Sequence, residues 1–239
     1  MGEFSDAPHF DPVSYLLGQK SVKPEPVPDP PELPVVRLAG YYGDGSATAA
    51  TSIQVVGLSA SNTLISVMHR ADLTAPEDCV LLDKSTYTTT TGTQYVSVFK
   101  RRASTAALLT FTQASSGRIA ATAWGIGYPD QDFSLEKLDT QAFELFAGFT
   151  YTATKDFLFA TVSSIGSTGS GSVYVDADSK NFWLNAPSVL GVNQTVLRHF
   201  TGIHFPSDYP IDVTIGEKHT GSDSFNTTGQ AVIYKIVKA

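Results

Sequence analysis

The sequence has one cysteine, few charged residues and no long hydrophobic run. Cys79 stands alone among 239 residues, which excludes an internal disulfide and a multi-cysteine zinc site. No stretch approaches the roughly 18 consecutive apolar residues that a membrane-spanning helix requires. Charged residues make up 16% of the chain, and the formal net charge is −7, which is too acidic for a protein whose main task is binding nucleic acid.

The N-terminus lacks both parts of a secretory signal peptide. Residues 1–6 (MGEFSD) contain neither a basic n-region nor the start of an apolar h-region. We therefore expect the chain to be made in a cytosol.

The chain does contain material for a core, together with prolines gathered at one end. Hydrophobic residues make up 42% and aromatic residues 11%, which is too apolar for a wholly disordered chain. There are 26 threonines and 24 serines, and eight of the 13 prolines lie at or before Pro34. This uneven distribution predicts an N-terminal arm over residues 1–34 and a folded domain over residues 35–239.

The arm is expected to begin with a short amphipathic helix. Asp11 can cap a helix whose first turn holds Pro12. Val13, Leu16 and Leu17 then fall at i, i+3 and i+4, on one face. Because two turns are too few to persist alone in water, this face requires a partner surface.

Residues 23–34 carry proline at nearly every second position, which favours an extended spacer of about 3.1 Å per residue. One interpretation of the arm is a flexible tail with a chance apolar patch. The other, which we prefer, is a docking peptide on a stiff stalk.

From Val35 onward, short β-rich runs alternate with Gly, Ser, Asn and Asp, which favours an all-β sandwich or barrel. The predicted strands span residues 52–58, 63–69, 80–82, 94–100, 107–113, 118–126, 143–151, 156–163, 172–176, 195–201, 211–215 and 230–237.

The strands predicted at 94–100, 118–126 and 230–237 are apolar on both faces, which indicates central strands covered on both sides. The run Thr88–Gly92 suits an exposed hairpin or edge. Residues 130–145 have helical character and are expected to link two halves of the domain.

Two segments repeat loosely along the chain. Residues 63–67 resemble residues 156–162, and residues 118–126 parallel residues 230–237. The domain is therefore predicted to be a jelly-roll-like β-sandwich with two similar halves, 35–128 and 139–239. Two small stacked sandwiches are the alternative; we prefer one sandwich.

No set of residues predicts catalysis, a metal or a cofactor. Candidate carboxylates for glycoside hydrolysis occur mostly in turn-like stretches: Asp130, Asp132, Asp176, Asp178 and Glu217. The densest metal-capable set is better explained as solvent or loop residues: His199, His204, Asp208, Asp212 and His219. The basic run Lys100–Arg102 is expected to be solvated.

Aromatic side chains offer a candidate sugar-binding face, because a ring gives a flat apolar surface and Tyr and Trp add a polar group. The candidates are Tyr41, Tyr42, Trp183 and Tyr209. The competing interpretation places them in the core or over the end of the stalk.

Residues 10–20 (FDPVSYLLGQK) resemble a short opening peptide found on small structural proteins of tailed phages and prophages. The stretches Asn62–Ile65, Ser97–Lys100 and Thr110–Ser116 are similar to jelly-roll-like β domains of phage appendage proteins. The resemblance implies a virion protein made in the host bacterial cytoplasm.

Together these features predict a non-enzymatic structural or attachment protein that forms a homo-oligomer. Its arm would dock onto another virion protein, such as a capsid, portal or tail component. The docking contacts would be Phe10, Val13, Tyr15, Leu16 and Leu17. A carbohydrate-binding module is the alternative function, and a glycan-cleaving enzyme is a more remote one.

Overall fold

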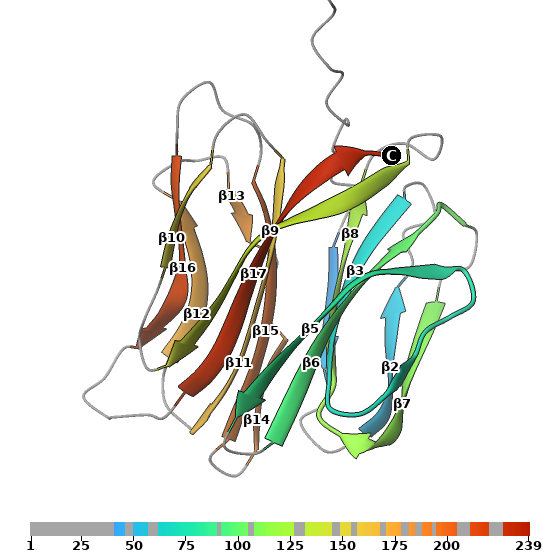
Figure 1. Ribbon diagram of the computed structural model, residues 1–239. Coiled ribbons are helices and arrows are strands. Elements are labelled where there is room, and N and C mark those ends of the chain that lie inside the picture. Colours follow the sequence, from blue (N-terminus) through green and yellow to red (C-terminus); the bar gives the residue numbers. More distant parts are fainter. Residues whose placement is uncertain are drawn as a thin grey trace, which may run out of the picture. The chain divides into compact units, whose positions relative to one another are not determined.

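The computed structural model describes the greater part of the chain after residue 40 (Figure 1). The described residues are 41–45, 50–56, 62–89, 92–104, 108–126, 132–144, 149–153, 157–167, 171–177, 182–184, 188–192, 195–204, 211–219 and 227–239. The predicted N-terminal helix and the proline-rich arm lie outside them.

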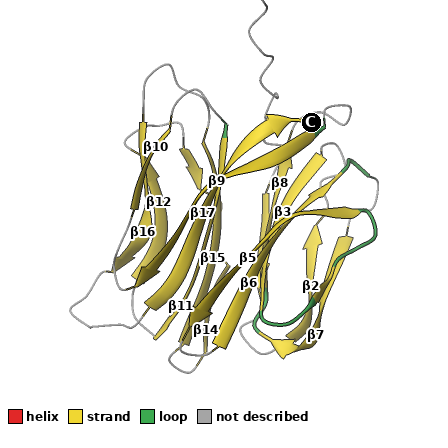
Figure 2. Ribbon diagram, in the orientation of Figure 1, coloured by secondary structure: helices red, strands yellow, loops and turns green. Residues whose placement is uncertain are grey.

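Every described element is a β-strand, which confirms the predicted all-β class (Figure 2). The strands of the first part of the chain are β1 (Tyr41–Gly45), β2 (Ala50–Val56), β3 (Asn62–His69), β4 (Leu73–Thr74), β5 (Cys79–Thr89), β6 (Gly92–Arg101), β7 (Leu108–Gly117) and β8 (Ala120–Ile126). Those of the second part are β9 (Phe133–Glu144), β10 (Phe149–Ala153), β11 (Leu158–Ser167), β12 (Gly171–Ala177), β13 (Phe182–Leu184), β14 (Ser188–Val192), β15 (Thr195–His204), β16 (Ile211–His219) and β17 (Thr227–Lys238). Over these stretches there is no helix that could span a membrane.

The strands form four antiparallel sheets, which we name A to D. Sheet A has the order β1-β8-β3-β6-β5, and sheet B has the order β2-β7-β4. Sheet C has the order β13-β15-β11-β17-β9, with β14 also paired to β15. Sheet D has the order β10-β16-β12.

The predicted helical link over residues 130–145 is wrong, because β9 occupies most of it. β9 pairs with β17 along its whole length, from Phe133 opposite Lys238 to Glu144 opposite Thr228. The register shifts where Asp139 and Lys137 face consecutive residues of β17, so that Leu138 is an extra residue. Such a bulge interrupts the alternation expected of a strand, which explains why the sequence pattern looked helical.

The strands β3, β6 and β8 of sheet A are buried on both faces over most of their length, as predicted for β6 and β8. On β3, Ile65 and Val67 belong to a core shared with sheet B, whereas Leu64 belongs to a core shared with sheet C. The A–B core includes Ile53, Phe99, Leu109, Phe111 and Ala123. The A–C core consists of Leu64, Val98, Trp124, Ile126, Phe133, Phe159, Ile203, Val232, Tyr234 and Ile236. Figure 1 shows the sheets as successive layers, with A and C in the middle.

The predicted edge hairpin at Thr88–Gly92 is confirmed. β5 and β6 pair as far as Thr89 opposite Gly92, and β5 is the last strand of sheet A. Gly92 has a φ of 114°, a backbone conformation that glycine adopts more readily than residues with a side chain. Its position therefore helps the chain to reverse between these strands.

The strand pairing of the first part recurs in the second. The pairs β1–β8, β8–β3 and β3–β6 recur as β9–β17, β17–β11 and β11–β15. In the small sheets, β2–β7 and β7–β4 recur as β10–β16 and β16–β12. The two segments that look alike in sequence, in β3 and β11, are thus the central strands of sheets A and C.

Candidate functional site

The predicted contact residues are only partly placed. The docking residues Phe10, Val13, Tyr15, Leu16 and Leu17 lie outside the described residues, as does Tyr209.

Three of the four sugar-binding candidates lie on edge strands of different sheets. In β1, Tyr41 pairs with Trp124 and Tyr42 with Ala123, whereas Trp183 in β13 pairs with Ile203. The side chains of Tyr41, Tyr42 and Trp183 are not among those that the structure describes.

The best-defined polar arrangement is the seam where sheets A and C face each other. Trp124 Nε1 of β8 donates a hydrogen bond to Thr201 Oγ1 of β15 at 2.7 Å. Thr201 Oγ1 donates in turn to Thr122 Oγ1 of β8 at 2.9 Å. All three residues are buried, so these bonds satisfy polar groups that would otherwise be costly to remove from water.

His199 is the second polar contact of the seam. Its Nε2 lies 3.3 Å from the carbonyl oxygen of Ser66 in β3, and its Nδ1 lies 2.7 Å from Ser163 Oγ in β11. A carbonyl oxygen can only accept, so Nε2 carries the proton and Nδ1 accepts from the Ser163 hydroxyl. Burial lowers the pKa of His199 to about 4, opposed by the hydrogen bond to Ser66. The ring is therefore neutral at pH 7.

Asp83 of β5 links sheet A to strands β9 and β17 of sheet C at one edge of the seam. Its carboxylate accepts a hydrogen bond from Tyr234 Oη at 2.8 Å. It also forms an ion pair with Lys137 Nζ at 2.6 Å. Asp83 follows Leu82, the extra residue in β5 where the register of that strand shifts. The bulge in β5 and the strands β9 and β17 therefore meet at one carboxylate. Burial, with the nearby charge of Asp83, raises the pKa of Tyr234.

The basic run Lys100–Arg102 is not simply solvated, contrary to the prediction. Arg101 is 1% exposed and its Nε pairs with Asp78. Lys100 Nζ pairs with Asp132 at 2.8 Å and donates to the carbonyl oxygen of Phe133. Only Arg102 is well exposed, with its guanidinium 3.5 Å from Asp132. Opposite charges thus compensate one another along this strand end.

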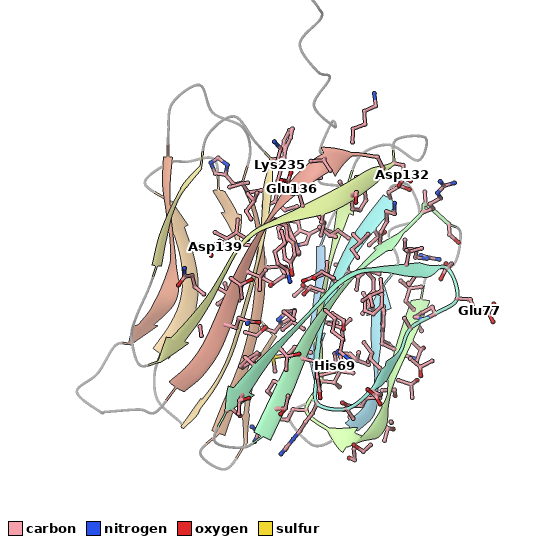
Figure 3. All side chains as sticks on the ribbon, viewed as in Figure 1. His69, Glu77, Asp132, Glu136, Asp139 and Lys235 are labelled. Carbon is pink, nitrogen blue, oxygen red and sulfur yellow. The ribbon has the colours of Figure 1, made fainter. Side chains whose placement is uncertain are left out.

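These charged residues line an open pocket of about 480 Å³. Its lining consists of Glu77, Asp78, Val80, Lys100, Arg102 and Asp132. Glu77 lies on the turn before β5, and Asp132 lies just before β9 (Figure 3). The hydrogen bond from Lys100 lowers the pKa of Asp132, which keeps this carboxyl ionised. Neighbouring Cys79 has its pKa raised to about 12, chiefly by burial, so its thiol is a poor nucleophile at neutral pH.

The described members of the metal-capable set lie on two strands of different sheets. His199 and His204 lie in β15 of sheet C, whereas Asp212 and His219 lie in β16 of sheet D; Asp208 is outside the described residues. The expectation of solvent or loop histidines is wrong for His199 and His204, which are fully buried. Across the described ranges, no group of three or more His, Cys, Asp or Glu residues is arranged to hold a metal ion.

The candidate carboxylates that the structure describes lie in separate segments of the chain. Asp132 is engaged with Lys100, Asp176 pairs in β12 with Thr214, and Glu217 pairs in β16 with Val173. Asp130 and Asp178 lie outside the described residues.

Sequence reasoning did not identify the polar seam. Ser66, Ser163 and Thr201 look like ordinary strand residues in a chain rich in serine and threonine. None of the three lies in a strand predicted to be covered on both faces. The available signal was the run 118–126, which is predicted to be covered in this way and contains Thr122 and Trp124, the partners of Thr201.

Comparison with known proteins finds no match to this chain among protein-family models, curated proteins or solved structures.

Proposed function

We propose that this chain is a non-enzymatic structural protein of a tailed-phage virion. Residues 1–34 dock onto another virion protein, and the β domain is displayed for assembly or host-surface attachment. The observation that carries the proposal is the strand pairing. Sheets A (β1-β8-β3-β6-β5) and B (β2-β7-β4) share a core, and apart from the pairing of β5 with β6 this order supports a jelly-roll plan. The same order recurs in sheets C and D.

Jelly rolls are a common architecture of viral capsid and lectin domains. Fold alone does not determine function, so this support is by analogy. The capped apolar stripe of the arm adds an independent argument, because a two-turn helix requires a partner surface. The open pocket beside Lys100 has compensated charges, and the seam between sheets A and C is joined by buried hydrogen bonds. Both features suit a rigid module better than a reactive site.

The proposal is tested by deleting residues 1–34 and following two properties. We expect the truncated protein to keep a β-type circular dichroism spectrum and to be absent from purified particles. A truncated protein that still joins the particle would contradict the docking role.

A paired substitution in the full-length chain localises the contact. Leu16→Ser with Leu17→Ser removes the apolar stripe and is expected to abolish incorporation. Ser14→Ala, which alters the same segment outside that stripe, is the matched control and is expected to incorporate normally.

Carbohydrate binding is the second candidate function, favoured because lectins share this plan and because Tyr41, Tyr42 and Trp183 lie on edge strands. A glycan array probed with the full-length protein tests it. Binding that is lost in Trp183→Ala without loss of fold would favour the lectin role, and an array with no bound glycan would remove it.

A further inference from the structure

The two halves correspond residue for residue in their central strands. Leu64 of β3 faces Trp124 on one side and Lys100 on the other. Phe159 of β11 faces Tyr234 and Ile203 in the same way. Leu64 and Phe159 both belong to the A–C core, so the equivalence holds for the face of the strand as well as for its pairing.

The closing strands of the halves show the correspondence in their side chains. This register makes Ala121, Trp124 and Ile126 of β8 equivalent to Ala231, Tyr234 and Ile236 of β17. Two of these three pairs are identical residues and the third is aromatic in both halves. Both aromatic residues and both isoleucines lie in the A–C core.

The edge beside β6 is also reproduced, including its irregularity. On β5, residues Cys79–Leu81 face Arg101–Phe99, and after the register shift Ser85–Thr89 face Val96–Gly92. In the second half, β13 faces His204–Gly202 and β14 faces His199–Thr195. The break between β13 and β14 therefore falls where β5 has its bulge.

Several contacts between the halves are reciprocal. β1 contacts β14, and the equivalent strands β9 and β5 are also in contact. In the same way, β8 contacts β14, and the equivalent strands β17 and β5 are in contact. Val98 of β6 and Tyr234 of β17 lie together in the A–C core. Their equivalents in the other half, Thr201 of β15 and Trp124 of β8, are joined by a hydrogen bond. Exchanging the halves maps these contacts onto one another, which is the property of a two-fold, isologous interface.

We propose that residues 41–126 and 133–238 are two copies of one eight-strand unit, in which β13 and β14 together correspond to β5. The copies are packed about an approximate two-fold axis that lies between sheets A and C. The partner that this interaction surface fits is the other copy, as in a homodimer joined into one chain. The inference rests on strand register and does not depend on the virion role.

The polar seam is where the copies have diverged. His199 corresponds to Val96, and Thr201 corresponds to Val98. The hydrogen bonds from His199 to Ser66 and from Trp124 to Thr201 therefore have no counterpart of the same chemistry across the axis. These bonds favour one copy as the specific partner of the other over two identical copies.

Cleavage of the full-length folded protein tests the proposal. A recognition site for a specific protease is inserted between Gly127 and Tyr128, where the chain passes from one unit to the other. After cleavage we expect two fragments that elute together at the mass of the intact chain. Their urea midpoint should rise with protein concentration, because unfolding then separates two chains. The intact chain should show no such dependence.

A matched insertion between Thr105 and Ala106, within the first unit, is the control. After complete unfolding and dilution from urea, fragments cut between the units should regain the paired complex, whereas fragments cut within a unit should not. Fragments that separate as folded monomers would overturn the interface. Loss of fold on cleavage between the units, or equal recovery of both cut forms, would overturn the assignment of complete units.

Discussion

The indole nitrogen of Trp124 donates to the hydroxyl of Thr201, and this 2.7 Å bond joins strands that are 77 residues apart in the chain. Trp124 also fills the A–C core, and Thr201 passes the bond on to Thr122. The same side chain thus supplies apolar area and directional bonding across the seam.

Trp124→Phe keeps most of the apolar contact and removes the donor. Because a net buried hydrogen bond contributes about 0.5–1.5 kcal/mol and the smaller ring leaves space, we expect a loss of about 2 kcal/mol in the free energy of unfolding. Urea unfolding of Trp124→Phe, Thr201→Val and the double variant gives a coupling energy between the two residues. Strictly additive effects would contradict a direct bond.

His199 predicts acid sensitivity. Its pKa of about 4 in the folded protein lies below the ordinary value of 6.5, so the unfolded chain binds more protons between these pH values. Stability should therefore fall as the pH decreases from about 6.5 towards 4, by at most about 1.4 kcal/mol per pH unit from this group.

His69 adds a loss of the same sign, because burial lowers its pKa to about 4 as well. Its ring contacts Ser97 Oγ and the carbonyl oxygen of Ala71 within the first half, away from the second (Figure 3). We expect the urea midpoint to fall between pH 7 and pH 4.5. This fall should be smaller in His199→Gln and smaller in His69→Gln than in the unmodified protein. An unchanged slope in both variants would show that other groups govern acid unfolding.

The sequence predicts the all-β class and most strands, because β-branched and aromatic runs between turn residues are a local signal. It also predicts that the run 118–126 is covered on both sides, and all seven residues of β8 within that run are buried. It fails for β9, where the extra residue Leu138 breaks the alternation. A bulge depends on the partner strand, which lies almost 100 residues further along the chain.

The seam could not be predicted for a related reason. A serine such as Ser66 or Ser163 has the same local pattern whether it faces water or another sheet. Its burial is decided by which strands pair and which sheets stack, and these contacts join residues far apart in sequence. The same holds for Arg101, a charged residue at a strand end that is buried against Asp78.

Tyr234→Phe should be more damaging than Lys137→Met, although both residues contact Asp83. The Tyr234 hydroxyl is bonded to a carboxylate in a mostly buried setting, and such bonds contribute about 1.5–3 kcal/mol. The Lys137 side chain is 39% exposed, and exposed ion pairs contribute about 0–1 kcal/mol. Urea unfolding of both variants checks the order. A larger loss for Lys137→Met would show that the ion pair holds the β5 bulge against β9.

Gly92→Ala should destabilise the edge hairpin. The φ of 114° at Gly92 is strained for any residue with a side chain, and an added Cβ would lie 3.1 Å from Arg70 Nη2. Since the Arg70 side chain can move, the backbone term dominates, and we expect a loss of about 1 kcal/mol or more. Thr93→Ala, at an exposed position in the same hairpin, is the control and should change stability by less than about 0.5 kcal/mol. Thermal and urea unfolding of the two variants measure this difference. Equal stability of Gly92→Ala and Thr93→Ala would show that alanine accepts the backbone conformation at residue 92.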